Sequence, residues 1–162
     1  MVLFNASEIY QFAIKIEENG EKFYKDLARK IENEEIKNLF NYLASEEVKH
    51  KETFENMLSK IKDYDLSGEY PEEYFTYLRT YANNIVFSEE RLNEEIEKIK
   101  DIVSALDFGI QKEVETILYY QEIKNLIPKD QHSLIDAIIE EERGHFLKLS
   151  QIKENLLKEG RK

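Results

Sequence analysis

Residues 45–50 read SEEVKH, and residues 140–145 read EEERGH. Each stretch places a glutamate three residues before a histidine, Glu47 before His50 and Glu142 before His145. The neighbouring apolar residues recur at helical spacing, so both pairs are predicted to lie on the inward face of a helix. Because an unpaired buried carboxylate costs several kcal/mol, inward-facing pairs of this kind indicate a functional site.

Both stretches belong to an internal repeat. Residues 13–24 (AIKIEENGEKFY) align with residues 109–120 (GIQKEVETILYY), and residues 41–54 align with residues 136–149, at an offset of about 96 residues. Each copy predicts a pair of helices, with one glutamate in the first helix and the Glu-x-x-His pair in the second. Two such copies indicate a helix bundle with a pseudo-twofold axis.

Capping and breaking residues divide the chain into elements. Three residues are expected to cap the starts of long helices: Asn5, supported by Glu8 three residues later, Asp101 and Asp130. Pro128 is expected to end one of these helices. The predicted long helices cover residues 6–31, 33–62, 101–126 and 130–158. Short helices are expected at residues 71–83, beginning at Pro71, and from Ser88 onward.

These elements predict an all-α fold. We expect one domain over residues 1–162, in which helix pair 6–62 and helix pair 101–158 are joined by a crossover at 63–100. A length of 162 residues suits one compact domain. The predicted architecture is a four-helix bundle with a long crossover that contains one or two short helices.

Each of the four predicted inner helix faces carries a carboxylate near its middle. Residues spaced alternately three and four apart share one face of a helix, and apolar residues flank the acids and histidines on every such face. The inward-facing polar residues are Glu17, Glu47, His50, Glu113, Glu142 and His145. Four uncompensated acids would use up much of a domain's stability, so either cations or protons must neutralise them. Carboxylates with one imidazole per ion suit iron or manganese, with zinc as a possible occupant.

The composition excludes several classes of function. The chain has no cysteine, which rules out disulfides, zinc–thiolate sites and thiol catalysis. Its net charge of −11 has the wrong sign for binding nucleic acids or anionic membranes. No stretch approaches the ~20 apolar residues that span a bilayer, and no signal peptide is evident. We therefore expect a cytoplasmic protein.

One Glu from each of two helices, with Glu-x-x-His from each of two others, resembles the ferritin-like superfamily and its rubrerythrin or erythrin-like branch. The resemblance covers both helix pairs, about two-thirds of the chain. It implies two iron ions, with Glu17 and Glu113 as terminal ligands, Glu47 and Glu142 as bridging ligands, and one histidine on each ion. It also implies supporting residues around the ligands, namely Tyr24, Tyr120, Glu46 and Glu141. The tyrosines would donate hydrogen bonds to the acids, and the two glutamates would orient the histidines across the centre.

Two departures from the family pattern affect the expected chemistry. Full rubrerythrins carry a cysteine-rich rubredoxin domain, so this chain needs an external electron donor such as a rubredoxin. Rubrerythrins also have a movable glutamate one turn after the third-helix ligand, where this chain has Thr116. Glu115 is expected to point away from the site, and Glu21 is an alternative position for such a ligand.

The resemblance implies a non-haem di-iron oxidoreductase that reacts Fe(II) with hydrogen peroxide or dioxygen, in peroxide detoxification or as a ferroxidase. The alternative is a ferritin-like protein that binds or stores iron without turnover. The predicted helices within the crossover argue against a storage cage, whose subunits cross the bundle with a mostly extended loop. A third interpretation is a metal-free structural bundle with protonated acids. A homodimer is expected, and the crossover could allow helix pairs to be exchanged between subunits.

Overall fold

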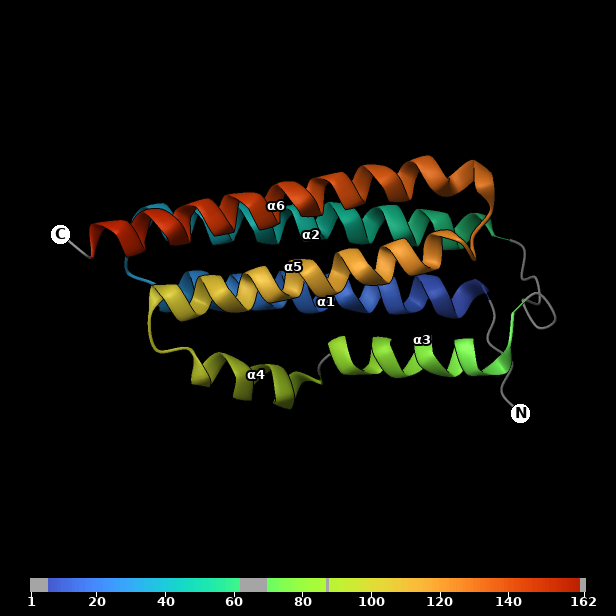
Figure 1. Ribbon diagram of the computed structural model, residues 1–162, viewed down its shortest axis with the longest axis horizontal. Coiled ribbons are helices and arrows are strands. Elements are labelled where there is room, and N and C mark those ends of the chain that lie inside the picture. The colour runs from blue at the N-terminus through green and yellow to red at the C-terminus, as the bar shows by residue number, and fades with distance from the viewer. Residues whose placement is uncertain (1–5, 62–69, 87, 161–162) are drawn as a thin grey trace.

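The computed structural model describes residues 6–61, 70–86 and 88–160. Long helices form four of its elements, and two shorter α-helices and one 3-10 turn complete them (Figure 1). The elements are α1 (Ala6–Lys30), α2 (Glu34–Lys60), α3 (Glu72–Ile85), α4 (Glu89–Lys98), α5 (Ile102–Lys124), η1 (Lys129–Gln131) and α6 (His132–Glu159).

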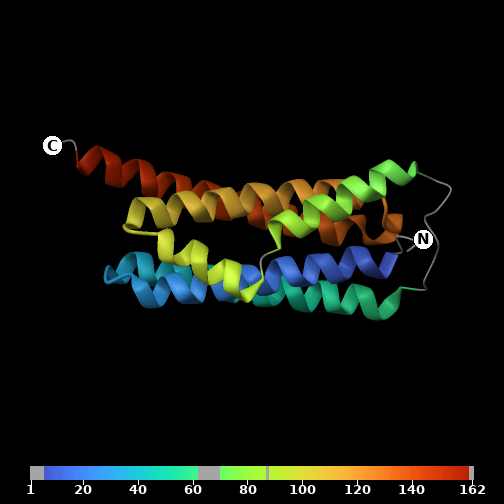
Figure 2. The ribbon, with the colours of Figure 1, turned by 90° about the horizontal axis from the view of Figure 1, so that it is seen from below.

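The helices are arranged in layers. Helices α1 and α2 form one antiparallel pair, and α5 and α6 form the other (Figure 1). The crossover helices α3 and α4 follow each other along the side of the bundle that α1 and α5 present, as both views show (Figures 1 and 2). The predicted fold class, an all-α ferritin-like bundle with helices in its crossover, is confirmed.

Side-chain caps begin several of the helices. The Asn33 carboxamide oxygen accepts a hydrogen bond from the backbone N–H of Ile36 at 3.1 Å, and the Ser88 hydroxyl accepts one from Arg91 at 3.2 Å. Asp101 forms a reciprocal capping box with Ser104, as expected for a residue that begins a helix. The predicted cap at Asn5 lies outside the described residues.

The start of α6 differs from the prediction. Asp130 does not cap the helix but lies within the 3-10 turn η1, and α6 begins two residues later at His132. The backbone N–H of Gln131 donates to the Pro128 carbonyl at 3.0 Å, which closes this tighter turn. The chain therefore passes from Pro128 into α6 through the turn, without a side-chain cap.

Two apolar clusters fill the bundle, one toward each end. One is built around Ile9, Phe54, Tyr119 and Ile135, and the other around Leu27, Phe40, Leu106 and Leu149. The inward-facing glutamates and histidines fall between these clusters along all four long helices. The apolar ends thus hold a polar layer at mid-bundle. None of the described helices is long and apolar enough to cross a membrane.

Candidate metal centre

The four long helices bring the six predicted polar side chains together in this layer. Helix α1 contributes one glutamate, α5 contributes another, and α2 and α6 each contribute a glutamate and a histidine one turn apart. All six are buried: Glu17, Glu47, His50, Glu113, Glu142 and His145. Their spacing puts them on the inner faces of the helices, in register with the apolar residues on either side.

The donor atoms fall into two overlapping groups. Glu17, Glu47, His50 and Glu142 form the first, and within it one ligand atom from each residue lies within 4.8 Å of the others. The second group, which meets the same limit, combines Glu47 and Glu142 with Glu113 and His145. Each group therefore holds one histidine and one carboxylate of its own, and the two groups share Glu47 and Glu142.

The histidines lie side by side at the centre of this arrangement. The Nδ1 atom of His50 lies 3.1 Å from Glu142 Oε1, 3.6 Å from Glu17 Oε2 and 3.7 Å from a Glu47 oxygen. The Nδ1 atom of His145 lies 3.0 Å from Glu142 Oε2. The two imidazole rings stack with their centroids 5.9 Å apart. Glu142 therefore reaches both histidines, one with each oxygen.

Buried donor atoms without hydrogen bonds mark the first group. Glu17 Oε2, His50 Nδ1 and Glu142 Oε1 are sealed from solvent, and none of them has a hydrogen-bond partner among the described residues. Orphaned polar atoms of this kind are rare in folded proteins and call for a specific explanation. All three point at one another from different helices, so a single cation among them would satisfy all three.

The carboxyl groups of the site cannot all be ionised without a cation. Burial, followed by repulsion from Glu142, raises the pKa of Glu47 and of Glu113 well above the ordinary range. Burial also opposes ionisation of Glu142, but the hydrogen bond with His145 and the proximity of His50 lower its pKa overall. Burial alone would lower the pKa of His50, yet its close carboxylates raise it far above the usual value. Protons therefore occupy this cluster wherever metal does not.

Two tyrosines cross-link the helix pairs at the site. The Tyr24 hydroxyl on α1 donates a hydrogen bond to Glu113 on α5, and the Tyr120 hydroxyl on α5 donates one to Glu17 on α1. The family resemblance implied hydrogen bonds from these two tyrosines to the acids. Each bond fixes one oxygen of a carboxylate that belongs to a single group, and so orients the remaining oxygen toward the centre.

The predicted supporting glutamates differ from each other. Glu141 Oε2 lies 2.7 Å from His50 Nε2, across the bundle, as expected for a carboxylate that orients the imidazole. Glu46 Oε1 instead accepts a hydrogen bond from Lys49 at 2.5 Å on its own helix. Within the described residues no bond joins Glu46 to His145, so its predicted role is not seen here. The lysine one turn along α2 supplies a nearer positive partner.

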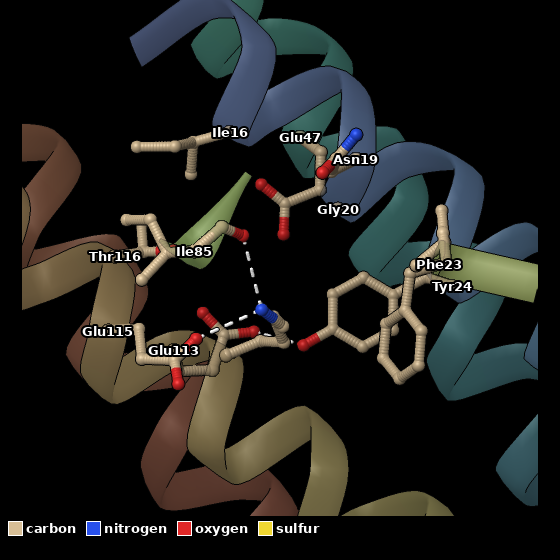
Figure 3. Close-up of a pocket in the computed structure, with 12 residues that line it drawn as sticks. Ile16, Asn19, Gly20, Phe23, Tyr24, Glu47, Ile85, Glu113, Glu115 and Thr116 are labelled. Carbon is tan, nitrogen blue, oxygen red and sulfur yellow. Dashed lines mark hydrogen bonds and ion pairs between the residues drawn. The ribbon is translucent and has the colours of Figure 1, made fainter. Parts of the chain in front are cut away.

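A small cavity opens onto the centre between α1 and α5, and Ile85 at the end of α3 and Leu92 on α4 also line it (Figure 3). Its volume of about 20 Å³ suits roughly one water-sized molecule. Glu47 and Glu113 reach it from α2 and α5, and Thr116 lines its wall (Figure 3). Gly20 lines it too, and a Cβ atom there would lie 3.0 Å from Glu47 Cδ. The absence of a side chain at Gly20 therefore leaves room for the Glu47 carboxylate.

Two further glutamates, Glu21 and Glu115, lie outside both donor groups. Glu21 bonds Lys25 and lies 4.0 Å from Lys51, and it belongs to neither donor group. Glu115 is also absent from both groups. It lines the cavity all the same, because the mouth of the cavity faces the crossover helices as well as the bundle axis. Thr116, at the position of the movable glutamate in rubrerythrins, is buried and lines the same cavity.

Lys112 is a cavity residue that sequence reasoning did not single out. Its ammonium group donates to Glu115 at 2.9 Å and to the Ile85 carbonyl, at the end of α3, at 3.2 Å. Burial lowers the pKa of Lys112, and Glu115 opposes this shift. The sequence carries no clear signal for this contact, because it depends on where the crossover lies. For Gly20 the sequence does carry a signal, because a glycine stands on the inner face of its helix three residues after the predicted ligand Glu17.

Comparisons with known proteins agree with this geometry. The rubrerythrin family profile matches residues 8–153. A crystal structure from Thermotoga maritima, described as a candidate ferritin-like diiron-carboxylate protein, is 29% identical and superposes with a TM-score of 0.72. That alignment covers 95% of this chain and 97% of the other. None of the curated proteins searched gives a match. On the extent of the family match, the chain belongs to the rubrerythrin family.

Proposed function

We propose that this protein is a non-haem di-iron oxidoreductase of the rubrerythrin type, which reacts Fe(II) with hydrogen peroxide or dioxygen. The observation that carries the proposal is the pair of overlapping donor groups, with three buried donor atoms that have no hydrogen-bond partner in the described part of the chain. Each group offers three carboxylates and one imidazole, a donor set that suits iron or manganese and also accepts zinc. The donor set therefore fits the metal content that the family implies.

Each donor group would hold one ion, and the two residues that the groups share would contact both ions. Glu17 and His50 would hold one ion, Glu113 and His145 would hold the other, and Glu47 and Glu142 would hold both. Iron bound there supplies the electrons that reduce the oxidant. The surrounding side chains fix the ligands: Tyr24 and Tyr120 hold Glu113 and Glu17, and Glu141 holds the His50 ring.

The cavity beside Glu47 and Glu113 gives the centre an approach sized for a small molecule. A volume of about 20 Å³ is compatible with dioxygen or hydrogen peroxide as the oxidant. Apolar side chains line part of the cavity, and its polar lining consists of Asn19, Thr116, Tyr24, the Lys112–Glu115 pair and the ligand carboxylates. No side chain of the two donor groups occupies the position of the movable rubrerythrin glutamate, so the proposal does not include a ligand that switches.

Stopped-flow absorption of the anaerobic Fe(II)-loaded protein tests the proposal. We expect about two iron ions bound per chain. With one of the two oxidants, the bound iron should be oxidised much faster than free Fe(II) in buffer. Faster oxidation by peroxide would assign a peroxidase, and faster oxidation by dioxygen would assign a ferroxidase or oxidase. Failure to bind iron after anaerobic reconstitution would instead favour the metal-free structural bundle.

The storage alternative makes a different prediction. A storage protein would accumulate many ferric ions per chain, whereas the proposed oxidoreductase would stop near two and turn over when electrons are supplied. The helices α3 and α4 in the crossover disfavour a ferritin-like cage. A homodimer in the cytoplasm, re-reduced by an external protein such as a rubredoxin, completes the proposal. Size-exclusion chromatography with light scattering would measure the assembly state.

A further inference from the structure

Six of the ten tyrosines form a continuous series of ring contacts from the surface to the candidate metal centre. We call this series the tyrosine path; it consists of Tyr70, Tyr74, Tyr77, Tyr81, Tyr119 and Tyr120. Three of its members lie on α3, one precedes α3, and the last two are adjacent on α5. The side chain of Tyr77 is 49% exposed, whereas Tyr119 and Tyr120 are fully buried.

The contacts along the path are short at every step. Stacked pairs join Tyr70 to Tyr74, Tyr74 to Tyr77 and Tyr77 to Tyr81, with centroid distances of 5.4, 6.2 and 6.2 Å. Tyr81 then stacks on Tyr119 at 6.5 Å, with the rings nearly parallel. These distances fall within the ordinary range for interacting aromatic rings.

The inner end of the path meets the metal centre directly. Tyr119 packs edge-on against Tyr120 at 6.0 Å, and the Tyr120 hydroxyl donates a hydrogen bond to Glu17. Because Glu17 belongs to the first donor group, one side chain separates the last ring from the proposed ion. Packing alone would account for each pair, but not for a series that runs unbroken from solvent to a proposed ligand.

Tyrosine is the side chain in this protein best suited to lose and regain an electron. The chain contains no tryptophan and no cysteine, the other two residues that are readily oxidised by one electron. Oxidation of a tyrosine releases its phenolic proton, so each member needs an acceptor. Tyr74 donates to a Glu122 carboxylate at 2.8 Å, whereas Tyr81 and Tyr119 donate to backbone carbonyls at 2.7 and 3.1 Å.

We propose that the tyrosine path conducts single electrons from the exposed face of α3 to the metal centre when dioxygen is reduced there. This inference rests on the proposed function. Reduction of dioxygen to two waters consumes four electrons and four protons, and two ferrous ions supply two of the electrons. Two tyrosines supply the other two electrons and two protons, solvent supplies the remaining protons, and two tyrosyl radicals are left. A reduced electron-transfer protein at α3 then returns two electrons, and solvent returns the two protons.

The acceptors determine where the radicals come to rest. A backbone carbonyl cannot keep the proton of Tyr81 or Tyr119, so an oxidised ring at either position takes an electron from its neighbour and regains its proton. At Tyr74 the Glu122 carboxylate can take the proton, and at exposed Tyr77 water can take it. The radicals therefore collect at the α3 end of the path, where an external donor can reach them.

A competing exit lies at Tyr42. Its ring meets His145 edge-on at 6.1 Å, it is 43% exposed, and Lys148 lies over it at 4.5 Å. A route through Tyr42 would be one ring long and would bypass α3 entirely. The cation over the ring opposes the formation of a positive charge there, which favours the tyrosine path over this shorter exit.

The first experiment uses the Fe(II)-loaded protein, mixed with dioxygen without any reductant in the presence of a spin trap, followed by peptide mass mapping. We expect adducts at Tyr74 and Tyr77 in the wild type and their loss in both Tyr81→Phe and Tyr119→Phe, while the Tyr10→Phe control retains them. Iron content and circular dichroism show that each variant is folded. Adducts at Tyr42 alone, or adducts on α3 that survive both substitutions, would overturn the inference.

A second experiment needs no metal and so separates this inference from the proposed function. The chain lacks cysteine, so Glu73→Cys offers one attachment point for a photo-oxidant, one turn from Tyr77 on the same helix face. After a flash, we expect part of the electron paramagnetic resonance signal to come from Tyr120, because its hydroxyl donates to the Glu17 carboxylate, which can take the phenolic proton when no metal ion is bound there. This component is identified by its loss in Tyr120→Phe and should also disappear in Tyr81→Phe; its persistence in Tyr81→Phe, or its absence from the labelled protein, would refute the path even if iron binds and reacts as proposed.

Discussion

The two halves of the bundle repeat the same sequence pattern but differ in what surrounds each histidine. In the α1–α2 half, His50 contacts three carboxylates on one nitrogen and Glu141 on the other. In the α5–α6 half, the nearest carboxylate to His145 is Glu142, at 3.0 Å, and the Glu46 counterpart bonds Lys49. The proposed ions therefore occupy unequal sites, although the ligands are related by pseudo-symmetry. This inequality can be tested by substituting equivalent positions and comparing the responses.

The largest difference is expected between shared and unshared ligands. Glu142→Gln removes a charge that serves both groups and both histidines, so iron content should fall from about two ions per chain to about none. Glu17→Gln should lower the iron content only to about one, because Glu17 belongs to the first group alone. Elemental analysis of anaerobically loaded protein measures both. The control Glu18→Gln, at an exposed neighbouring position, should keep both ions; equal losses in the Glu142 and Glu17 variants would show that the two groups act as one.

The next largest effect concerns the residues behind the histidines. Glu141→Gln weakens the partner of His50 and should reduce iron affinity at that site by about 10-fold, the low end of the usual 10–100-fold range, because the Glu141 side chain is 54% exposed. The matched variant Glu46→Gln removes a carboxylate that contacts Lys49 and should leave affinity nearly unchanged. Competitive titration with a chelator measures both affinities. An equal or larger effect at Glu46 would mean that the asymmetry seen here is not a property of the loaded protein.

The asymmetry also shows how far sequence reasoning extends. The repeat and the helical spacing predicted the four long helices and the convergence of the six polar side chains, because inner-face periodicity determines which residues are buried. The bonds from Tyr24 and Tyr120 to the acids were expected from the family resemblance and not from periodicity. The resemblance also treated Glu46 and Glu141 as equivalent, because matched positions do not show which competing partner, such as Lys49, lies closer.

The crossover set the other limit on prediction. Sequence patterns located its two short helices, but not the side of the bundle they cover. That placement decides which residues line the cavity. It brings Lys112 into contact with the Ile85 carbonyl, and it makes Glu115 part of the cavity lining. It also completes the tyrosine path, since Tyr81 on α3 meets Tyr119 on α5 only when α3 lies against α5. Contacts of this kind depend on tertiary packing, which periodicity does not encode.

A smaller effect is expected from pH. The raised pKa values of Glu47 and Glu113 mean that both hold protons in the metal-free protein above the ordinary value of 4.5. Their contribution to stability is fully present below that value and is lost as pH rises through the folded-state pKa. Metal binding must displace these protons, and also that of His50, so apparent affinity should rise with pH. Calorimetry in buffers of different ionisation enthalpy should show proton release on binding; proton uptake would contradict the assignment.

The smallest expected effect compares two helical glycines, one in each half. A Cβ atom at Gly20 would press on Glu47, 3.0 Å from its Cδ and 3.2 Å from its Oε1, whereas one at Gly144 would meet no atom of the described residues within 4 Å. Alanine at either position gains about 0.5–1 kcal/mol from helix propensity. At Gly20 the crowding costs roughly 1–3 kcal/mol, which offsets or exceeds that gain. Gly144→Ala should therefore stabilise the metal-free protein against urea, and Gly20→Ala should not.

The same pair of variants separates packing from metal binding. Glu47 can relieve the crowding at Gly20 only by moving its carboxylate away from the shared position between the two donor groups. Iron affinity of Gly20→Ala should therefore fall at both sites together, even where its stability is unchanged, because one ligand serves both. Gly144→Ala, adjacent to His145 but facing open space, should bind iron as the wild type does. If Gly20→Ala bound two ions with unaltered affinity, Glu47 would be able to shift and still serve both donor groups. The space left by Gly20 would then shape the cavity without being needed for metal binding.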